Sequence, residues 1–328
     1  MININTSQVE QFMWIDFNLT NFSDFREVVH AWDIDFLQLD GGGFHATLQQ
    51  VIFPEIQIAH TSFDCHMDQK GFSPKDMWTF VLMSETSSMI KFQHEITQSK
   101  NTMLIYSPGM EINAVTTAGF EIYLFTVHKE YLQTVTKKLG FDDIENRLSK
   151  IDRLELEDKQ VDSLRTLLKG IINTASKLES KIITAEGKSL IYNFLPMKFL
   201  KEIGVKIGCA KEKTFQDKDM LFKELRAYVH THLQELLNIA QLSNKFNISE
   251  RSLRNYFHQE FDTSPKKYLT SLRLAKVRDE LKVLKKEKGV VEKTARAFGF
   301  QHMGQFSKNY KEYFGELPSE TLQGHENK

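Results

Sequence analysis

The spacing of hydrophobic residues changes along this chain, from short, partly alternating apolar segments to a repeat of three or four residues. The first pattern runs from Ile34 to about Val127, with glycine- and proline-bearing turns between the segments. Residues 45–53, 56–60 and 122–127 are typical of strands. Many short strands without long intervening helices predict a sandwich or a small barrel.

Beyond residue 127 the apolar residues follow the helical period. The pattern predicts a helix over residues 128–139 and a longer helical run over 157–200, which Pro196 should kink or end. Apolar residues of the longer run form a heptad seam: Leu164, Leu168, Ile171, Ala175, Leu178 and Ile182. The seam fits either a dimer interface or packing onto the chain's own strands, and the sequence favours neither.

Two copies of a helix–turn–helix pattern follow, over residues 239–261 and 290–314. In the first copy Asn247 occupies the turn, because asparagine tolerates the left-handed conformation, and Ser249 is a suitable N-cap for the second helix. Gly299 occupies the turn of the second copy. The second helix of each copy buries an apolar stripe, namely Leu253, Phe257 and Phe261, and then Phe306, Tyr310 and Phe314. In a DNA-binding helix-turn-helix motif, the second helix lies in the major groove and its polar outer face contacts the base edges, as this pattern would allow.

The positive charge of the chain is concentrated in the same region. The whole sequence has a net charge of −1, whereas residues 239–315 contain 16 Lys and Arg against 8 Asp and Glu, which leaves −9 for the rest. The helix predicted between the two copies, over about 264–286, is basic and begins with Ser264 as N-cap and Pro265 at the first position. A phosphate backbone is a natural partner for such a surface, although a solvated basic surface has the same composition.

The pattern of these residues resembles the AraC/XylS family of transcription regulators. The resemblance rests on residues 248–253, Phe257, Ser264–Pro265, 268–269, 272–274, 299–300, Phe306 and 313–318. It implies an α+β multidomain protein, with a cupin-like β-barrel or jelly-roll sensor and a C-terminal all-α domain that holds two helix-turn-helix motifs. Residues 32–63 and 299–306 also look like the branch of this family that regulates ethanolamine utilisation.

The patterns and the resemblance together divide the chain into four segments. We expect a sensor domain over residues 1–140 and a helical dimerisation or connecting segment over 141–203. A linker over 204–217 leads to a DNA-binding domain over 218–328.

The outward faces of the two recognition helices supply the candidate DNA contacts, since Arg suits guanine and Asn or Gln suits adenine. The candidates are Arg251, Ser252, Arg254, Asn255 and His258 in the first copy, and Gln301, His302, Gln305, Lys308 and Asn309 in the second. Lysines at helix ends or on the connecting face are expected to meet phosphates, and these are Lys266, Lys267, Lys285, Lys286 and Lys311.

The predicted barrel lacks the sequence features of an active site. Its histidines, which are His45, His60, His66 and His94, are scattered, and no two lie two residues apart as they do in many metal-binding cupin enzymes. Phosphate-binding and nucleophile motifs are missing as well. We therefore predict no catalytic residues, no metal and no cofactor. A metal-dependent cupin enzyme with a DNA-binding tail is the alternative from another class, and metal analysis would separate the two.

A large β-rich module without catalytic residues is best explained by a pocket whose small-molecule effector biases DNA binding. The aromatic residues available to line it are Trp14, Trp32, Phe44, Trp78, Phe80 and Tyr123, most of them expected in the core. A domain that serves only protein contacts is the remaining alternative, which a thermal-shift screen of metabolites would distinguish.

The last expectations concern location and partners. The first residues are polar, whereas a secretory signal contains an apolar stretch. No apolar run approaches the roughly 20 residues that span a bilayer. We expect a cytoplasmic protein without a membrane partner. Its expected partners are double-stranded promoter DNA, RNA polymerase, a small-molecule effector and a second copy of the chain.

Overall fold

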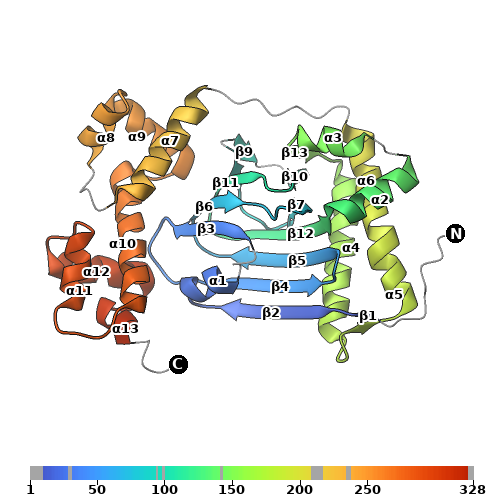
Figure 1. The fold of residues 1–328 in the computed structure, drawn as a ribbon, viewed down its shortest axis with the longest axis horizontal. Helices are drawn as coiled ribbons and strands as arrows, with labels where there is room; N and C mark the ends of the chain where they lie inside the picture. The colour runs from blue at the N-terminus through green and yellow to red at the C-terminus, as the bar shows by residue number, and fades with distance from the viewer. Residues whose placement is uncertain are drawn as a thin grey trace.

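The computed structural model describes residues 10–28, 32–93, 95–97, 100–140, 143–207, 217–233 and 238–323. Two antiparallel β-sheets form the N-terminal part, helices cover one side of it, and a separate group of helices forms the C-terminal part (Figure 1). The β-rich N-terminal region and the helical C-terminal region predicted from the sequence are thus confirmed. No helix within these ranges is long and apolar enough to cross a membrane.

The larger sheet has seven strands in the order β13-β10-β7-β12-β5-β4-β2. Their bounds are β2 (Met13–Leu19), β4 (Ala46–Ile52), β5 (Ile56–Phe63), β7 (Met77–Met83), β10 (Thr102–Tyr106), β12 (Phe120–His128) and β13 (Arg153–Glu155). The smaller sheet has the order β3-β6-β11-β8-β9. Its strands are β3 (Asp33–Gln38), β6 (Met67–Phe72), β8 (Ile90–Phe92), β9 (Glu95–Thr97) and β11 (Glu111–Thr116). Two short strands, β1 (Glu10–Gln11) and β14 (Ile182–Ile183), pair with each other.

The strands begin earlier than the alternation predicts. Strand β2 runs antiparallel to β4, with Met13 opposite Ile52 and Leu19 opposite Ala46. Strand β2 is an edge strand whose Asp16 and Asn18 are exposed, and Asp16 accepts hydrogen bonds from Gln49 at 3.3 and 3.4 Å. Those polar residues interrupted the apolar pattern, so the sequence analysis missed the strand.

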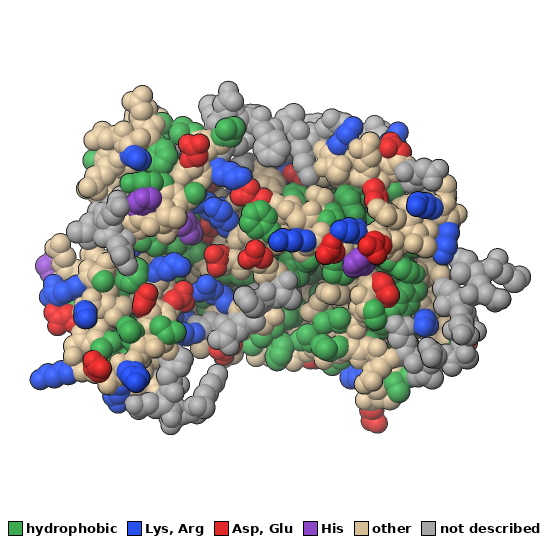
Figure 2. Space-filling view, in the orientation of Figure 1, with side chains coloured by type: hydrophobic (Ala, Val, Ile, Leu, Met, Phe, Trp, Pro, Cys, Tyr) green, Lys and Arg blue, Asp and Glu red, His purple; other side chains and the backbone are tan. Residues whose placement is uncertain are grey.

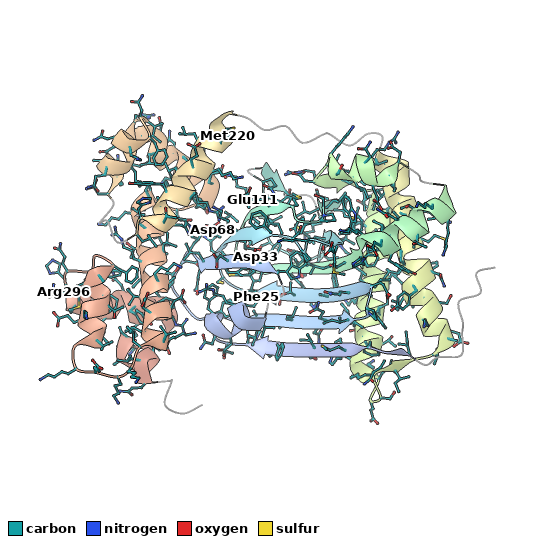
Figure 3. The ribbon with its side chains drawn as sticks, viewed as in Figure 1. Phe25, Asp33, Asp68, Glu111, Met220 and Arg296 are labelled. Atoms are coloured by element: carbon teal, nitrogen blue, oxygen red, sulfur yellow. The ribbon has the colours of Figure 1, made fainter. Side chains whose placement is uncertain are left out.

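Aromatic side chains fill the space between the two sheets. Phe25, from helix α1 (Phe22–Val28), lies against Phe36, Phe44 and Phe63, with ring centroids 5.1, 5.4 and 6.0 Å away. Figure 3 labels Phe25 beside the strands. Phe92 is also fully buried in this cluster. Aromatic rings are the largest contributors to a core, so the interior between the sheets is a packed core.

Helices cover the other face of the seven-stranded sheet. They are α2 (Lys129–Leu139), α3 (Ile144–Ser149), α4 (Asp158–Lys177), α5 (Ala185–Ser189), the π-helical turn η2 (Leu190–Phe194) and α6 (Leu195–Lys206). The seam residues of α4 from Leu164 to Ala175 are buried in the core that α4 shares with β4, β5 and β12. In this structure the heptad seam of α4 therefore packs onto the chain's own seven-stranded sheet, which is one of the two alternatives.

The predicted helical run over 157–200 breaks at a different place than expected. Residues 178–184 leave the helix and include β14, whereas Pro196 lies in the first turn of α6 and the helical run continues through it. The prediction that Pro196 ends the run was wrong. Within an unbroken run Pro196 lacks the N–H that would donate to the carbonyl of Tyr192, and that carbonyl accepts from the Tyr131 hydroxyl at 2.5 Å instead.

The C-terminal part consists of α7 (Asp217–Thr231), α8 (Ile239–Lys245), α9 (Glu250–Phe261), α10 (Pro265–Val283), α11 (Val290–Ala297), α12 (Met303–Phe314) and α13 (Pro318–Gln323). Helix α10 lies between the pairs α8–α9 and α11–α12 (Figure 1). The expected core position Phe314 is only half-buried, and Tyr313 is buried in its place. The guanidinium of Arg278 lies 4.5 Å from the ring centroid of Phe314 and covers it.

The C-terminal helices pack against the five-stranded sheet and contact residues of β3, β6, β8 and β11. Leu37 and Leu39 belong to the same buried cluster as residues of α7, α9, α10 and α12. A Cβ added to Gly41 would lie 2.9 Å from the carbonyl oxygen of Glu312 in α12, so the glycine loop approaches that helix closely. The predicted linker falls largely on residues 208–216, which lie outside the described ranges.

Candidate nucleic-acid interface

The turn between α8 and α9 is fixed by local hydrogen bonds. Asn238 caps α8, and its side chain and that of Gln241 exchange hydrogen bonds with each other's backbone N–H at 2.9 Å. Asn247 has φ 49°, the predicted left-handed conformation. The N–H of Ile248 donates to the carbonyl of Ser243 at 3.1 Å, and the Ser243 hydroxyl donates back to the carbonyl of Ile248.

The turn between α11 and α12 repeats this geometry fifty-two residues later. Gly299 has φ 87°, and the N–H of Phe300 donates to the carbonyl of Ala295 at 3.0 Å. The bond from Phe246 to Leu242 likewise recurs from Phe298 to Thr294. Both helix pairs therefore turn through the same backbone conformation, with asparagine in one and glycine in the other.

Helix α9 presents its candidate DNA contacts to solvent. The predicted N-cap Ser249 accepts the Ser252 N–H at 3.0 Å, while Leu253, Phe257 and Phe261 are buried as predicted. All five candidates of this helix are exposed: Arg251, Ser252, Arg254, Asn255 and His258. The apolar stripe thus holds the polar face outward.

Two of these side chains already have partners on the same helix. The Arg254 guanidinium donates to the Glu250 carboxylate at 2.7 Å, and both side chains are about half exposed. The Ser252 hydroxyl lies 2.8 Å from that of the capping Ser249. An exposed pair of this kind contributes little to stability, so Arg254 can exchange Glu250 for another acceptor at low cost.

Helix α12 presents the second set. Gln301, His302, Gln305 and Lys308 are exposed and Asn309 is half-buried. The Gln305 amide donates to the Asn309 side-chain oxygen at 2.6 Å, and the Lys308 ammonium lies 3.8 Å from the Glu312 carboxylate. His302 occupies the N-cap position without a side-chain cap bond. Arg296 on α11 is also exposed, and it points away from the N-terminal part (Figure 3).

The five candidate phosphate contacts are all exposed. Lys266 and Lys267 lie in the first turn of α10, whose predicted cap Ser264 accepts the Lys267 N–H at 3.2 Å. Lys285 and Lys286 follow the end of α10, and Lys311 lies on α12. Figure 2 shows Lys and Arg side chains spread over the C-terminal helices, among acidic ones.

The connecting helix is less basic at its surface than its sequence suggests. Arg278 of α10 is buried at 5% exposure and donates to Glu316 at 2.8 Å and to the Asn21 side-chain oxygen at 3.2 Å. Part of the positive charge of this helix therefore serves contacts inside the molecule.

A buried ion pair joins the C-terminal helices to the five-stranded sheet, and sequence reasoning missed it. Arg226 of α7 forms a hydrogen-bonded ion pair with Asp68 of β6, and their side chains are 7% and 1% exposed. The Tyr268 hydroxyl of α10 donates to the other Asp68 oxygen at 2.8 Å, and Arg226 also donates to the Asn113 side-chain oxygen at 2.9 Å. Figure 3 places Asp68 on the side of the sheet that faces these helices.

Ion pairs nearer the surface surround this centre. Lys223 of α7 pairs with Glu111 of β11, and Arg26 of α1 pairs with Asp279 of α10 at 3.0 Å. Lys91 of β8 lies 3.1 Å from the carboxylate of Glu260, in the last turn of α9. The N-terminal part thus holds α7, α9 and α10 through side chains of both signs.

The histidine in this interface is neutral at ordinary pH. His230 of α7 lies 3.1 Å from the Tyr268 hydroxyl. Burial, and then the positive charges of Arg226, Lys70 and Lys276, lower the pKa of His230 to about 3.

The described histidines of the β-rich part do not form a metal cluster. His60 is hydrogen-bonded to Glu121 at 2.7 Å and stacks on Tyr123 with ring centroids 4.6 Å apart. His94 lies outside the described residues. Within the described ranges, no group of three or more His, Cys, Asp or Glu side chains is placed to hold a metal ion.

Comparisons with known proteins identify a family model in the C-terminal part. Residues 242–324 match a family model described as a helix-turn-helix domain. The XylDLEGF operon transcriptional activator of Pseudomonas putida is 29% identical over 125 residues, which cover 38% of this chain and 38% of that protein. The probable thc operon regulatory protein of Rhodococcus erythropolis is 38% identical over 96 residues, 29% of each chain. The chain therefore spans less than two-fifths of the length of these curated relatives.

A solved structure, that of the AraC-like transcriptional activator CuxR, is similar over a longer stretch. It is 17% identical with a TM-score of 0.46, and the match covers 80% of this chain and 94% of that one. The matched family model covers the helices whose turns and exposed faces are described above. Residues 242–324 therefore form a helix-turn-helix DNA-binding domain, the kind of domain that transcription regulators carry.

Proposed function

We propose that the whole chain is a sequence-specific DNA-binding transcription regulator in which both helix pairs, α8–α9 and α11–α12, act as helix-turn-helix motifs. The observation that carries the proposal is the repeated turn, followed each time by a helix with a buried apolar stripe and an exposed polar face. Two such helices on one rigid connector suit two successive major grooves.

In this proposal α9 and α12 read base edges. Arg251, Arg254 and Asn255 are the principal contacts of α9, and Gln305 with Asn309 forms a paired amide group on α12. Each good bidentate pair with a base contributes about 1–3 kcal/mol of discrimination. Arg254 would leave Glu250 for guanine, and Glu250 would then accept from another donor or from water.

The exposed lysines would set affinity rather than specificity. Lys266 and Lys267 lie at the N-terminus of α10, where backbone N–H groups add to their positive charge. Lys285, Lys286 and Lys311 would track the backbone on either side of the second motif. These contacts carry no base information.

The N-terminal part, in this proposal, is a cupin-like sensor over residues 1–140, joined through 141–203 and the linker 204–217 to the DNA-binding domain of 218–328. Helices of the second segment share one core with the sheet, so the two segments would respond to an effector as one body. The partners we propose are promoter DNA, RNA polymerase, a small molecule and a second copy. The names of the relatives favour activation of transcription, and the ethanolamine-utilisation branch stays a prediction from residues 32–63 and 299–306.

The test is binding of the intact chain to the promoter region beside its own gene. Arg251→Ala and Asn255→Ala should weaken the cognate site by about 1–3 kcal/mol and leave binding to random DNA unchanged. Gln259→Ala is the matched control, because Gln259 is exposed on the same helix but lies near its C-terminal end. Equal losses on cognate and random DNA would contradict base readout by α9, and no footprint by the wild-type chain would contradict the proposed function.

A further inference from the structure

An apolar cavity in the described part of the molecule lies between α4, α5, η2 and the ends of β1 and β4, outside the space between the sheets. It has a volume of about 390 Å³, within the range of small-molecule sites. Its walls include Phe12 and Phe53 on the strand side, Gly170 and Ile171 on α4, and Leu190 and Ile191 on η2. The pair β1–β14 closes one end, where the Phe12 N–H donates to the carbonyl of Lys181 at 3.0 Å.

The walls of this cavity are apolar and uncharged. The described residues that line it carry no ionisable side chain, and the polar ones are threonines of α4. The Thr174 hydroxyl donates to the carbonyl of Gly170 at 2.8 Å, within its own helix. The nearby Lys181 ammonium turns to the carbonyl of Ala175 at 3.0 Å and lies 5.5 Å from the ring centroid of Trp14. Phe53, Ile171 and Ile191 form a buried floor, whereas Thr166, Gly170 and Thr174 lie on an exposed rim. A ligand charge placed against the floor would find no partner there, which is costly.

Two local features distinguish this cavity from a packing gap. Gly170 stands in the middle of α4, where glycine weakens a helix, and a Cβ added to it would meet no atom within 4 Å. On the opposite wall η2 is a π-helical turn, an irregularity that often accompanies function in helical proteins. Open space thus lies beside Gly170 on one wall, and a π-helical turn forms the other.

None of the six aromatic residues expected to line a pocket takes part. Phe44 is buried between the sheets, and Trp78, Phe80 and Tyr123 belong to the core under the helices. These residues fill the described interior of the sandwich, whereas the space beside α4 is open. Phe12 and Phe53, whose ring centroids are 5.6 Å apart, supply its aromatic wall.

From this geometry we infer that the cavity beside α4 binds a small, uncharged, apolar molecule, aromatic or aliphatic. The inference rests on the proposed function, for which it names the site and the chemical class of the effector. The ligand contacts Gly170 on one side and the π-helical turn on the other. It therefore acts on the helical run α5–η2–α6, which leads to residue 207 at the end of the N-terminal part.

The test uses two dyes that differ by one charged group. N-phenyl-1-naphthylamine is uncharged and fluoresces when it leaves water, and 1-anilinonaphthalene-8-sulfonate is the same molecule with a sulfonate. The intact chain should bind the uncharged dye at least about tenfold more tightly than the charged one. Gly170→Leu puts four carbon atoms into the cavity and should weaken the uncharged dye by about tenfold or more. Lys169→Leu is the control, because it places the same side chain one residue away, on an exposed position outside the cavity walls.

Equal binding of the two dyes, or equal binding of the uncharged dye to wild type and Gly170→Leu, would overturn the inference. Sedimentation of both proteins tests another occupant: a dimer that Gly170→Leu abolishes, without dye binding by wild type, would assign this surface to a second copy. The thermal midpoint of Gly170→Leu must stay at or above that of Lys169→Leu, which shows that it folds. Failure of the proposed function is seen separately, as absence of the promoter footprint with dye binding intact.

Discussion

Removing Arg226 should uncouple the C-terminal helices from the N-terminal part. The Asp68 carboxylate is 1% exposed and has two described partners from the C-terminal helices, the Arg226 guanidinium and the Tyr268 hydroxyl. In Arg226→Ala only the Tyr268 hydroxyl remains. Breaking a buried ion pair by removing one partner costs about 3–5 kcal/mol. A typical domain is stable by about 5–15 kcal/mol, so this loss is large enough to separate the unfolding of the two parts.

The assay follows urea unfolding with two signals. All three tryptophans, Trp14, Trp32 and Trp78, lie in the N-terminal part, so their fluorescence reports that part alone, whereas far-ultraviolet circular dichroism also reports the helices. We expect coincident transitions in the wild type. In Arg226→Ala the circular dichroism transition should begin at lower urea than the fluorescence transition.

Lys223→Ala is the matched control for this prediction. Lys223 lies on the same helix and pairs with Glu111 across the same interface, but its side chain is 53% exposed. Such pairs contribute about 0–1 kcal/mol, so the two transitions should stay together. Removing Asp68 as well, in Asp68→Ala with Arg226→Ala, should recover part of the loss, because no charge is then left buried without a partner. A loss in Arg226→Ala no larger than that in Lys223→Ala would refute the reasoning.

Three further predictions concern single residues. The pKa of His230 is about 3 in the folded chain and 6.5 when the chain is unfolded. Between these pH values the unfolded state binds more protons, so the free energy of unfolding falls as the pH falls through this window. Between pH 7 and pH 5 the loss from His230 is about 2 kcal/mol, and His230→Gln should lack this part of the acid sensitivity in urea titrations at both pH values. Asn247→Val forces a β-branched residue to φ 49° and should cost about 1–3 kcal/mol, whereas Asn247→Gly should be close to neutral; equal effects would contradict a strained turn. Lys266→Ala should lower the log–log salt slope of DNA binding by about one and weaken all sequences alike, and an unchanged slope would remove Lys266 from the phosphate contacts.

Features of the DNA-binding part that depend on near neighbours could be predicted from the sequence. The caps Ser249 and Ser264 each accept an N–H three residues ahead, and the turn at Asn247 follows from the conformation of that one residue. The exposed face of α9 follows from the four-residue spacing of its buried stripe. Such signals lie within a few residues of each other, so one sequence is enough to find them.

Features that join distant residues could not be predicted. Asp68 and Arg226 are 158 positions apart, and the sequence gives no sign which of many carboxylates a given arginine meets. The seam of α4 illustrates the same limit, because its period identifies a buried face but not the surface that buries it. The break at residues 178–184 was hidden for another reason. Ile182 continues the helical spacing of apolar residues, yet its backbone pairs with Gln11 of β1, which lies far away in the sequence, near the N-terminus.

The interface around Asp68 bears on how an effector could reach DNA. Arg226 and Tyr268 attach α7 and α10 to β6, and α10 carries both helix pairs. The cavity beside α4 lies across the seven-stranded sheet from this attachment, so no side chain that lines the cavity belongs to the buried pair or its partners. A signal between them must therefore pass either through the packed phenylalanines between the sheets or along α5–η2–α6 toward α7. Packed cores change between discrete arrangements rather than deforming gradually. The π-helical turn lines the cavity and leads into α6, and its hydrogen-bond register differs from that of the α-helices on either side. We therefore expect a rearrangement caused by a ligand to begin at this turn.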